Sequence, residues 1–508
     1  MTFASILSER PGATYEPDAP AFFRDLNLDQ ICADMVKGKE EYDLVPFFNT
    51  PLTTVDAIEY RHEVFRDLEN SVLLEQIGTF AAHMQSMRSQ LARLNKLYYS
   101  LHQQGSFLDA IDFYCKAIAE FSSAISAVQL DSRGLRSFRT YLANYAAGSY
   151  FASLYTEMKE IKNALAEIRY CVLIDGNTFT VRNYDGQPDY SQQVDETFER
   201  FKQGAVKDYR VTFRESEDMN HIEAKILEFV SLLNPEIFSR LGGYCKRNKN
   251  FIDQTIAAFD REIQFYVSYL NYIEPLKTLS LPFCQPGISD QAKKIFNHGG
   301  FDLALARKLA NENIAVVSND FELQDRERII VVSGPNQGGK TTFARAFGQI
   351  HYLASLGVPV PGRQAQLFLY DRILTHFERE ERVESHRGKL QDDLVRIHDL
   401  LAQATGRSIL IMNEIFTSTT LHDETFLSHK IMTSVANLDM LCVWVTFVDE
   451  LARDNEKTVS MVSTVEPDDP AARTFKVIRQ RADGLAYAMA IAEKYRLTYK
   501  GIMKRVPA

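Results

Sequence analysis

The sequence predicts a chain of two structural classes, with long helices first and an α/β domain after them. Apolar residues recur at helical spacing over residues 54–82, 107–128, 134–168 and 218–275, with few Gly or Pro interruptions. A β-rich stretch at 169–214 separates the helical ranges. From about residue 290, short apolar strands such as IIVVS, SILIM and LCVWVTF alternate with helices, which is typical of a mainly parallel sheet.

Length and composition describe a globular chain. It has 508 residues, of which 45% are hydrophobic, and a net charge of -10. This length suffices for roughly two to four domains. No apolar run approaches the roughly 18 residues that span a bilayer, and the N-terminus lacks a signal pattern, so we expect no membrane contact. Six cysteines without a CxxC pair predict reduced thiols, a cytoplasmic location and no zinc site.

The helical region can be followed element by element. PLTTVDAIEY predicts a helix start with Thr53 or Thr54 at the cap. RYCVLIDGNTFTVRNYDG has β-rich residues on both sides of Asp175-Gly176, which predicts a hairpin, and KDYRVTFR at 207–214 predicts another strand. The simplest arrangement is a pair of antiparallel helical arms with a small β tip. The expected ranges are an N-terminal extension at 1–45, a helical core with the first arm at 46–168, a β-rich insertion at 169–214, a second arm returning to the core at 215–285, and the α/β domain at 290–508.

The loop GPNQGGKTT lies between the strand IIVVS and a helix and satisfies the pattern G-x-x-x-x-G-K-[ST] of a phosphate-binding loop. Its glycines let backbone N–H groups curl round the β-phosphate, Lys340 reaches the β- and γ-phosphates, and the Thr341 hydroxyl faces a Mg²⁺ ion. The alternative is a fortuitous Gly-rich turn, and the flanking strand and helix argue against it. The sequence therefore predicts a site for ATP and Mg²⁺, with nucleotide-binding residues Gly334, Pro335, Asn336, Gln337, Gly338, Gly339, Lys340, Thr341 and Thr342.

The strand SILIM ends in the polar pair Asn413-Glu414. In most phosphate-loop ATPases the first of these residues is an Asp that holds magnesium through water. Asn413 can accept a hydrogen bond from such a water but carries no charge, so we predict weak Mg²⁺ binding by Thr341 and Asn413. Glu414 stands in the position of a general base that orients the attacking water, and we predict it as the catalytic residue. The alternative is that both residues merely end a buried strand.

These residues resemble the ATPase domain of the MutS mismatch-repair family, whose phosphate loop shares the Pro-Asn and double Gly of GPNQGGKTT. Five further stretches resemble the family and occur in its order along the chain, two before the loop and three after it. They are IFNHGGFDLALA, VVSNDFEL, LGVPVPGRQAQLFLYDRILTHF, LLAQATGRSILIMNEIFTSTTLHD and RQRADGLAYAMAIAEKYRL. The resemblance implies an ABC-like P-loop ATPase fold in which Asn319 lies beside the nucleotide base. It also implies a helical core, lever helices and a clamp that closes over DNA. A homodimer is implied too, with each nucleotide closed by the partner's signature helix, here near Gly388.

The chain departs from the family pattern at several positions. Residues 1–45 precede the core pattern and contain no Phe-x-Glu wedge, so we expect no mismatch-reading domain. Asn413 replaces the magnesium-binding Asp, Phe447 replaces a His, and Gly388 replaces the Ser that opens the signature helix. The phosphate loop and Glu414 are retained. We therefore predict tight nucleotide binding with slow ATP hydrolysis.

The expected clamp offers little charge for DNA. Residues 169–214 contain seven basic and seven acidic side chains, so their net charge is about zero. Lys202, Lys207 and Arg210 could form a one-sided patch, and RLGGYCKRNKN at 240–250 is a second basic run. The alternative for each run is a solvated surface, so DNA binding rests on the resemblance.

Three functions remain open at this point. The leading one is an ATP-dependent DNA clamp that acts on branched or recombination-intermediate DNA, as a cytoplasmic protein that is nucleoid-associated if the source is bacterial. The alternative, from a different class, is an ATP-gated protein-interaction or scaffold protein that does not bind DNA. The third, initiation of mismatch repair, is disfavoured because the wedge is missing.

Overall fold

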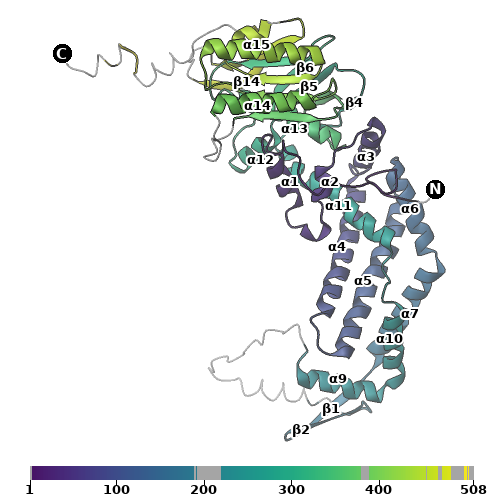
Figure 1. Cartoon of the computed structure of the whole chain (residues 1–508). Coiled ribbons are helices and arrows are strands. Elements are labelled where there is room, and N and C mark those ends of the chain that lie inside the picture. The colour runs from purple at the N-terminus through teal and green to yellow at the C-terminus, as the bar shows by residue number, and fades with distance from the viewer. Residues whose placement is uncertain are drawn as a thin grey trace. The chain divides into compact units, whose positions relative to one another are not determined.

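The computed structural model describes residues 3–187, 190, 219–378, 388–453, 455–466, 472–481, 497–499 and 502 (Figure 1). The chain divides into two compact units. The first consists of residues 1–3, 68–131 and 135–260, and the second of 4–67, 132–134 and 261–508. The boundaries of these two units differ from the domain ranges expected from the sequence. Those expected ranges remain a prediction. Within the described residues, none of the helices is long and apolar enough to cross a membrane.

The first unit is helical, with one hairpin. Its two longest complete helices, α4 (Ser71–Leu94) and α5 (Ser100–Ala127), pack along each other (Figure 1). The stacked rings of Phe80 and Phe121 join them, with centroids 4.8 Å apart. The other elements are α6 (Arg133–Ala146), α7 (Ser149–Glu167), β1 (Tyr170–Asp175), β2 (Thr178–Asn183), α9 (His221–Leu233), α10 (Pro235–Arg247) and the beginning of α11 (Gln254–Thr278).

The predicted helical ranges are helical, but local caps divide them. The range 54–82 contains α3 (Val55–Asp67) and α4, because the Asn70 side chain accepts hydrogen bonds from the first N–H groups of a new helix. Gly148, with an extended backbone and no side-chain cap, separates α6 from α7. Thr54 caps α3, since its hydroxyl accepts from the N–H of Ala57. The predicted hairpin is confirmed as β1 and β2, and the strand predicted at 207–214 lies outside the described residues.

The second unit is organised by a six-stranded sheet in the order β10-β11-β12-β7-β13-β14. The first five strands are parallel and β14 is antiparallel to β13, which agrees with the predicted mainly parallel sheet. The strands are β7 (Ile329–Ser333), β10 (Ile373–Phe377), β11 (Ile409–Asn413), β12 (Leu441–Val445), β13 (Thr458–Val465) and β14 (Arg473–Arg479). A smaller sheet orders β4 (Gly287–Ser289), β9 (Gln364–Phe368), β5 (Ile295–Gly300) and β6 (Asn319–Leu323), and β3 (Phe283–Cys284) pairs with β8 (Val360–Pro361).

Helices cover both faces of the large sheet. Because side chains alternate along a strand, Ile411 faces α13 (Lys340–Ser355), whereas Leu410 and Met412 face the core shared with α14 (Lys389–Gln403) and α15 (Leu421–Leu438). That core contains Trp444, the only tryptophan of the chain. The remaining helices of the unit are α1 (Leu28–Val36), η1 (Glu40–Tyr42), α2 (Val45–Asn49), α3, α12 (Leu303–Asn311) and η2 (Asp449–Arg453).

The N-terminal residues surround α13 within this second unit. Side chains along α13 bond to their backbone at successive turns: Arg345 donates to the carbonyl of Asp25 (3.0 Å), Gln349 to Leu26 (2.8 Å) and Tyr352 to Phe48 (2.7 Å). At the end of α13, the fully buried guanidinium of Arg61 donates to the carbonyl of Leu356 (2.8 Å). The helix that begins at the phosphate loop is therefore enclosed by residues 25–61.

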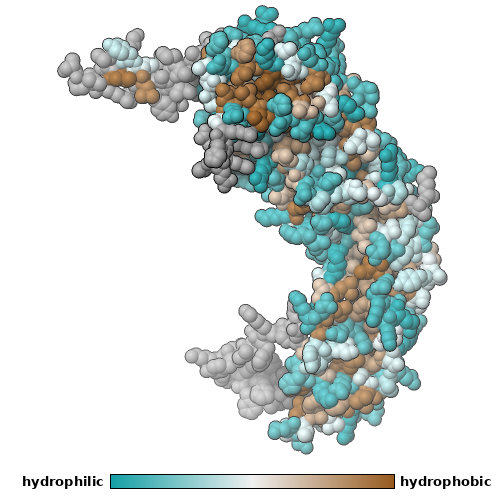
Figure 2. Space-filling model, in the orientation of Figure 1, coloured by the Kyte–Doolittle hydropathy of each residue, from teal (hydrophilic) through white to brown (hydrophobic). Residues whose placement is uncertain are grey.

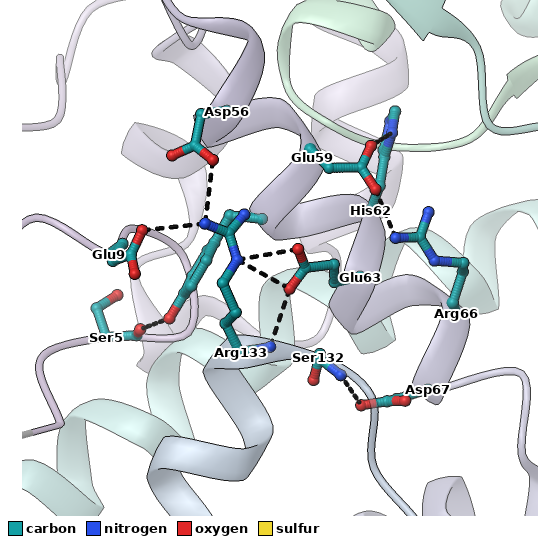
Figure 3. A network of polar contacts seen from close by, with 11 residues as sticks. Ser5, Glu9, Asp56, Glu59, His62, Glu63, Arg66, Asp67, Ser132 and Arg133 are labelled. Carbon is teal, nitrogen blue, oxygen red and sulfur yellow. Dashed lines mark hydrogen bonds and ion pairs between the residues drawn. The ribbon is translucent and has the colours of Figure 1, made fainter. Parts of the chain in front are cut away.

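A network of charges holds residues 132–134 in the second unit (Figure 3). Arg133 forms ion pairs with Glu9 (3.1 Å), Asp56 (3.0 Å) and Glu63 (2.9 Å). Its backbone N–H donates to Glu63, and the N–H of Ser132 donates to the Asp67 carboxylate. One arginine thus links the N-terminal segment to α3 at the point where the chain enters α6.

Candidate nucleotide site

The phosphate loop connects β7 to α13, as the sequence predicts. Gly334 has φ +116°, and a side chain there would lie 2.7 Å from the carbonyl oxygen of Ser463. Gly339 has φ +93° and occupies the N-cap of α13. Only glycine fits both requirements, so the glycine spacing of the motif is explained by backbone geometry.

Two residues that the sequence analysis did not identify hold the loop in place. The Ser463 hydroxyl of β13 donates to the carbonyl of Gly338 (2.6 Å), and the Arg473 guanidinium of β14 donates to the carbonyl of Asn336 (3.0 Å). Both lie more than a hundred residues beyond the loop in sequence, so no local spacing could have indicated them. Their strands reach the loop because β13 pairs directly with β7.

Lys340 points back into its own loop. Its ammonium donates to the carbonyls of Gly334 and Pro335 (both 3.1 Å) and lies 3.6 Å from a carboxylate oxygen of Glu414. The lysine side chain is only 3% exposed. Burial lowers the pKa of Lys340 below its ordinary value, and the Glu414 charge partly opposes this. The ring of Phe447 covers the ammonium, with the nitrogen 4.4 Å from the ring centre.

Thr341 and Asn413 meet across the site. The Thr341 hydroxyl donates to the side-chain oxygen of Asn413 at 2.8 Å, and Asn413 ends a buried strand of the central sheet. Both residues present oxygen atoms, the ligand type that Mg²⁺ prefers together with nucleotide phosphates. The pair therefore fits a magnesium ion, although neither oxygen carries a charge.

Glu414 follows Asn413 in a left-handed backbone conformation, with φ +52°. Its N–H donates to the carbonyl of Val445 (2.9 Å), so the residue is fixed to the end of β12. This geometry turns the carboxylate toward Lys340 and the phosphate loop. The three predicted residues Lys340, Asn413 and Glu414 are thus brought together with Thr341 at one edge of the sheet.

Asn319 lies at the start of β6 and is engaged with β14. Its amide nitrogen donates to the carbonyl of Phe475 (3.2 Å), and its amide oxygen accepts from the N–H of Val477 (2.8 Å). Phe475 in turn lies against Gly339 of the phosphate loop. A cavity of about 310 Å³ borders Asn319 and is lined by β6 and β14. Asn319 therefore forms hydrogen bonds to β14 beside the site. Its contact with the nucleotide base remains a prediction.

Gly388 is the N-cap of α14 and has an extended backbone, with φ -69° and ψ 155°. Among the residues that the structure describes, which leave out 379–387 directly before it, a Cβ built at Gly388 would meet nothing within 4 Å. As the N-cap residue, Gly388 directly precedes the N–H groups of the first turn of α14.

The candidate DNA-binding residues Lys202, Lys207 and Arg210 lie outside the described residues. The second basic run is partly neutralised in α10, where Arg240 pairs with Glu160 and Arg247 with Glu157 of α7. These pairs leave less free positive charge there than the sequence suggests.

The chain is similar in sequence to a known protein family and to several curated proteins. A family model described as MutS domain V matches residues 330–502. The chain is 28% identical over 217 residues to the DNA mismatch repair protein MutS of Orientia tsutsugamushi (strain Ikeda), which is 42% of this chain and 24% of that protein. It is 27% identical over 244 residues to the MutS protein of Chlorobium phaeobacteroides, covering 47% and 26% of the two chains.

A eukaryotic relative matches as well. The DNA mismatch repair protein MSH3 of Candida glabrata is 22% identical over 205 residues, or 39% of this chain and 19% of the relative. The matched region therefore spans about a quarter or less of the length of these curated relatives. The residues that the family model matches, 330–502, lie within the unit that carries the phosphate loop, Asn413 and Glu414.

Proposed function

We propose, from the premise that this chain belongs to the MutS family, that it is an ATP-dependent DNA-binding clamp with slow ATP hydrolysis. The observation that carries the proposal is the convergence of Lys340, Thr341, Asn413 and Glu414 at the end of β7, β11 and β12. This combination provides a phosphate loop, a magnesium-side oxygen pair and a carboxylate, which together serve phosphoryl transfer.

Each residue has a defined part in the proposed reaction. The N–H groups of the loop and the Lys340 ammonium bind the β- and γ-phosphates. Thr341 and Asn413 would hold Mg²⁺, which neutralises charge on the phosphates when it is bound. Glu414 orients the attacking water and accepts its proton. Because Asn413 supplies no negative charge, turnover is slow while nucleotide binding is retained.

A homodimer follows from the family's mode of action, in which the partner's signature helix closes each site. The position of Gly388 at the N-cap of α14 supports this role, because a helix N-terminus presents N–H groups to an anion. Figure 2 shows hydrophobic surface over α14 and α15. Its exposed large side chains are Leu394, Val395, Leu421 and Phe426. A surface of this kind marks a protein interface, so a second copy is its proposed occupant.

The proposed substrate is branched or recombination-intermediate DNA, recognised by its shape and backbone. The test is fluorescence anisotropy against labelled homoduplex, single-mismatch, fork and four-way-junction DNA at one stated salt concentration. Each DNA is titrated without nucleotide, with ADP, and with a non-hydrolysable ATP analogue. We expect a nucleotide-dependent preference for the branched DNAs. Equal binding of all four DNAs in every nucleotide state would contradict the proposal.

The second candidate is an ATP-gated protein-interaction or scaffold protein, and the β1–β2 hairpin favours it. Ile174 is 79% exposed at its turn, and Tyr170 and Leu173 are each 45% exposed. Apolar tips of this kind suit a protein partner better than a phosphate backbone. Failure to bind any DNA, with retained ATP binding, would favour this candidate over the clamp.

A further inference from the structure

The ammonium of Lys340 is surrounded by groups of the protein. The carbonyls of Gly334 and Pro335 accept its hydrogen bonds on the loop side, and the Asn336 side-chain oxygen lies at 3.5 Å. Glu414 provides a carboxylate, and the face of Phe447 lies 4.4 Å away. An aromatic face attracts a cation, so this ring is a fifth favourable contact. An incoming phosphate must therefore displace at least one of these groups.

Phe447 and the Asn336 side chain are the most easily displaced of them. The loop carbonyls belong to a backbone fixed by Ser463 and Arg473, and Glu414 is held through its own N–H. Phe447 is 43% exposed, against 24% for the Glu414 side chain, and Asn336 is exposed as well. The Phe447 ring can therefore turn outward without breaking a hydrogen bond.

The backbone on both sides of Phe447 is anchored. The N–H of Thr446 donates to the carbonyl of Val332 (3.1 Å), and the N–H of Val448 donates to the Thr446 hydroxyl (3.0 Å). Displacement therefore requires only a side-chain rotation, and the segment after β12 that carries Phe447 stays in place.

We propose that Phe447 is an autoinhibitory cover of the phosphate site: its ring lies over the Lys340 ammonium and must turn away before phosphate binds. The inference rests on the proposed nucleotide binding and adds a residue that regulates it. The cover lowers both the association rate and the affinity for nucleotide, because the contact between ring and cation is lost on binding.

The test is stopped-flow binding of a fluorescent ADP derivative to the full chain. Phe447→Leu and Phe447→Met keep an apolar side chain but remove the aromatic face, and each should raise the association rate and the affinity about 2-fold to 10-fold. Phe447→Tyr keeps the face and should behave as the unsubstituted protein. Far-UV circular dichroism and the unfolding temperature verify that each variant is folded.

Phe229→Leu is the matched control. Phe229 lies in α9 with the Lys225 ammonium 5.1 Å from its ring centre, so the substitution removes a similar contact in the other unit. It should leave nucleotide kinetics unchanged. Unchanged or slower association in both Phe447→Leu and Phe447→Met would overturn the inference while leaving the proposed function intact. Absence of nucleotide binding by the unsubstituted protein would instead overturn the proposed function, and the inference with it.

Discussion

The charged side chains at the two edges of the six-stranded sheet have different kinds of contacts. At the edge where the strands begin, the Asp439 carboxylate receives Lys293 (3.1 Å), Arg328 (3.2 Å) and Lys457 (2.8 Å). At the edge where they end, Lys340 has one carboxylate at 3.6 Å and otherwise contacts carbonyls and a ring.

We call the edge at Asp439, where the strands begin, the structural edge, and the edge at Lys340, where they end, the working edge. Three short ion pairs on one carboxylate fix the starts of β7 and β13 to the end of α15. The one ion pair of Lys340 is longer, at 3.6 Å, and its other contacts are to uncharged groups that phosphate oxygens can replace. Perturbing the working edge should therefore change nucleotide chemistry, and perturbing the structural edge should change stability.

The largest effect is expected for Lys340→Ala. Removing the ammonium should weaken ATP binding by about 100-fold or more, because the lysine supplies a charge-assisted contact to the phosphates. Isothermal titration calorimetry measures the affinity. Lys457→Ala, a lysine at the structural edge, is the control and should bind ATP normally. Retained affinity in Lys340→Ala would refute the assignment of the phosphate loop.

Glu414→Gln should reduce ATP turnover by about 100-fold, a typical loss for a general base. ATP affinity should change little, since the carboxylate is not expected to bind the phosphates. Phosphate release under single-turnover conditions, combined with the binding assay, separates the two quantities. Unchanged turnover would show that another group orients the water.

Asn413→Asp should raise turnover by roughly 10-fold, which corresponds to about 1.4 kcal/mol of added transition-state stabilisation. The added charge strengthens the magnesium side of the site, so the Mg²⁺ concentration for half-maximal activity should fall. Unchanged turnover in Asn413→Asp would indicate that another carboxylate already holds the Mg²⁺ ion. Asp423 is a poor candidate, because its carboxylate and N–H are both bonded to Thr420 in the cap of α15.

Asp439→Asn should lower the free energy of unfolding by about 1 kcal/mol, a discounted value because Asp439 is 40% exposed and its ion pairs are partly screened. Burial alone would raise the pKa of Asp439, but hydrogen bonds from Lys457, Lys293 and Arg328 hold it well below the ordinary value. This stabilisation is present above the unfolded pKa of about 4 and is lost as the pH falls toward the folded pKa.

The variant should therefore lose less stability than the unsubstituted protein when the pH is lowered from about 5 to 3. Urea unfolding at several pH values measures the difference. Equal slopes in the two proteins would mean that Asp439 is not stabilised by its three partners.

The smallest effect is expected for Gly388→Ser. A serine at this N-cap fits the extended backbone and should stabilise α14 by a few tenths of a kcal/mol, which shifts the unfolding temperature by about 1 °C. Differential scanning calorimetry detects a shift of this size. A decrease would indicate that the serine hydroxyl does not cap α14.

Much of the site could be predicted from the sequence because its chemistry is local. The phosphate loop occupies nine consecutive residues, and Asn413-Glu414 directly follows a recognisable strand. The same holds for the hairpin turn, where the residue type itself selects the backbone. Short-range signals of this kind need no knowledge of the tertiary fold. The break at Asn70, in contrast, lies inside a range that the sequence predicts as one helix.

Other features depend on which segments meet, and no pattern in the sequence encodes that directly. Ser463 and Arg473 act on the loop only because β13 and β14 are placed beside β7. Residues 1–45 are predicted only as an N-terminal extension, and no sequence pattern says that part of it packs on α13. Likewise, Phe447 can cover the ammonium only because the Lys340 side chain turns back into its own loop.

The enclosure of α13 determines how this protein can be divided for experiment. Thirteen of its sixteen residues are buried, partly by the N-terminal segment. A recombinant fragment that starts at residue 290 would expose that helix and lose the bonds from Asp25, Leu26, Phe48 and Arg61. An isolated nucleotide module should therefore be made by joining residues 4–67 to residues from 261 onward through a short flexible linker, with the first unit removed from between them.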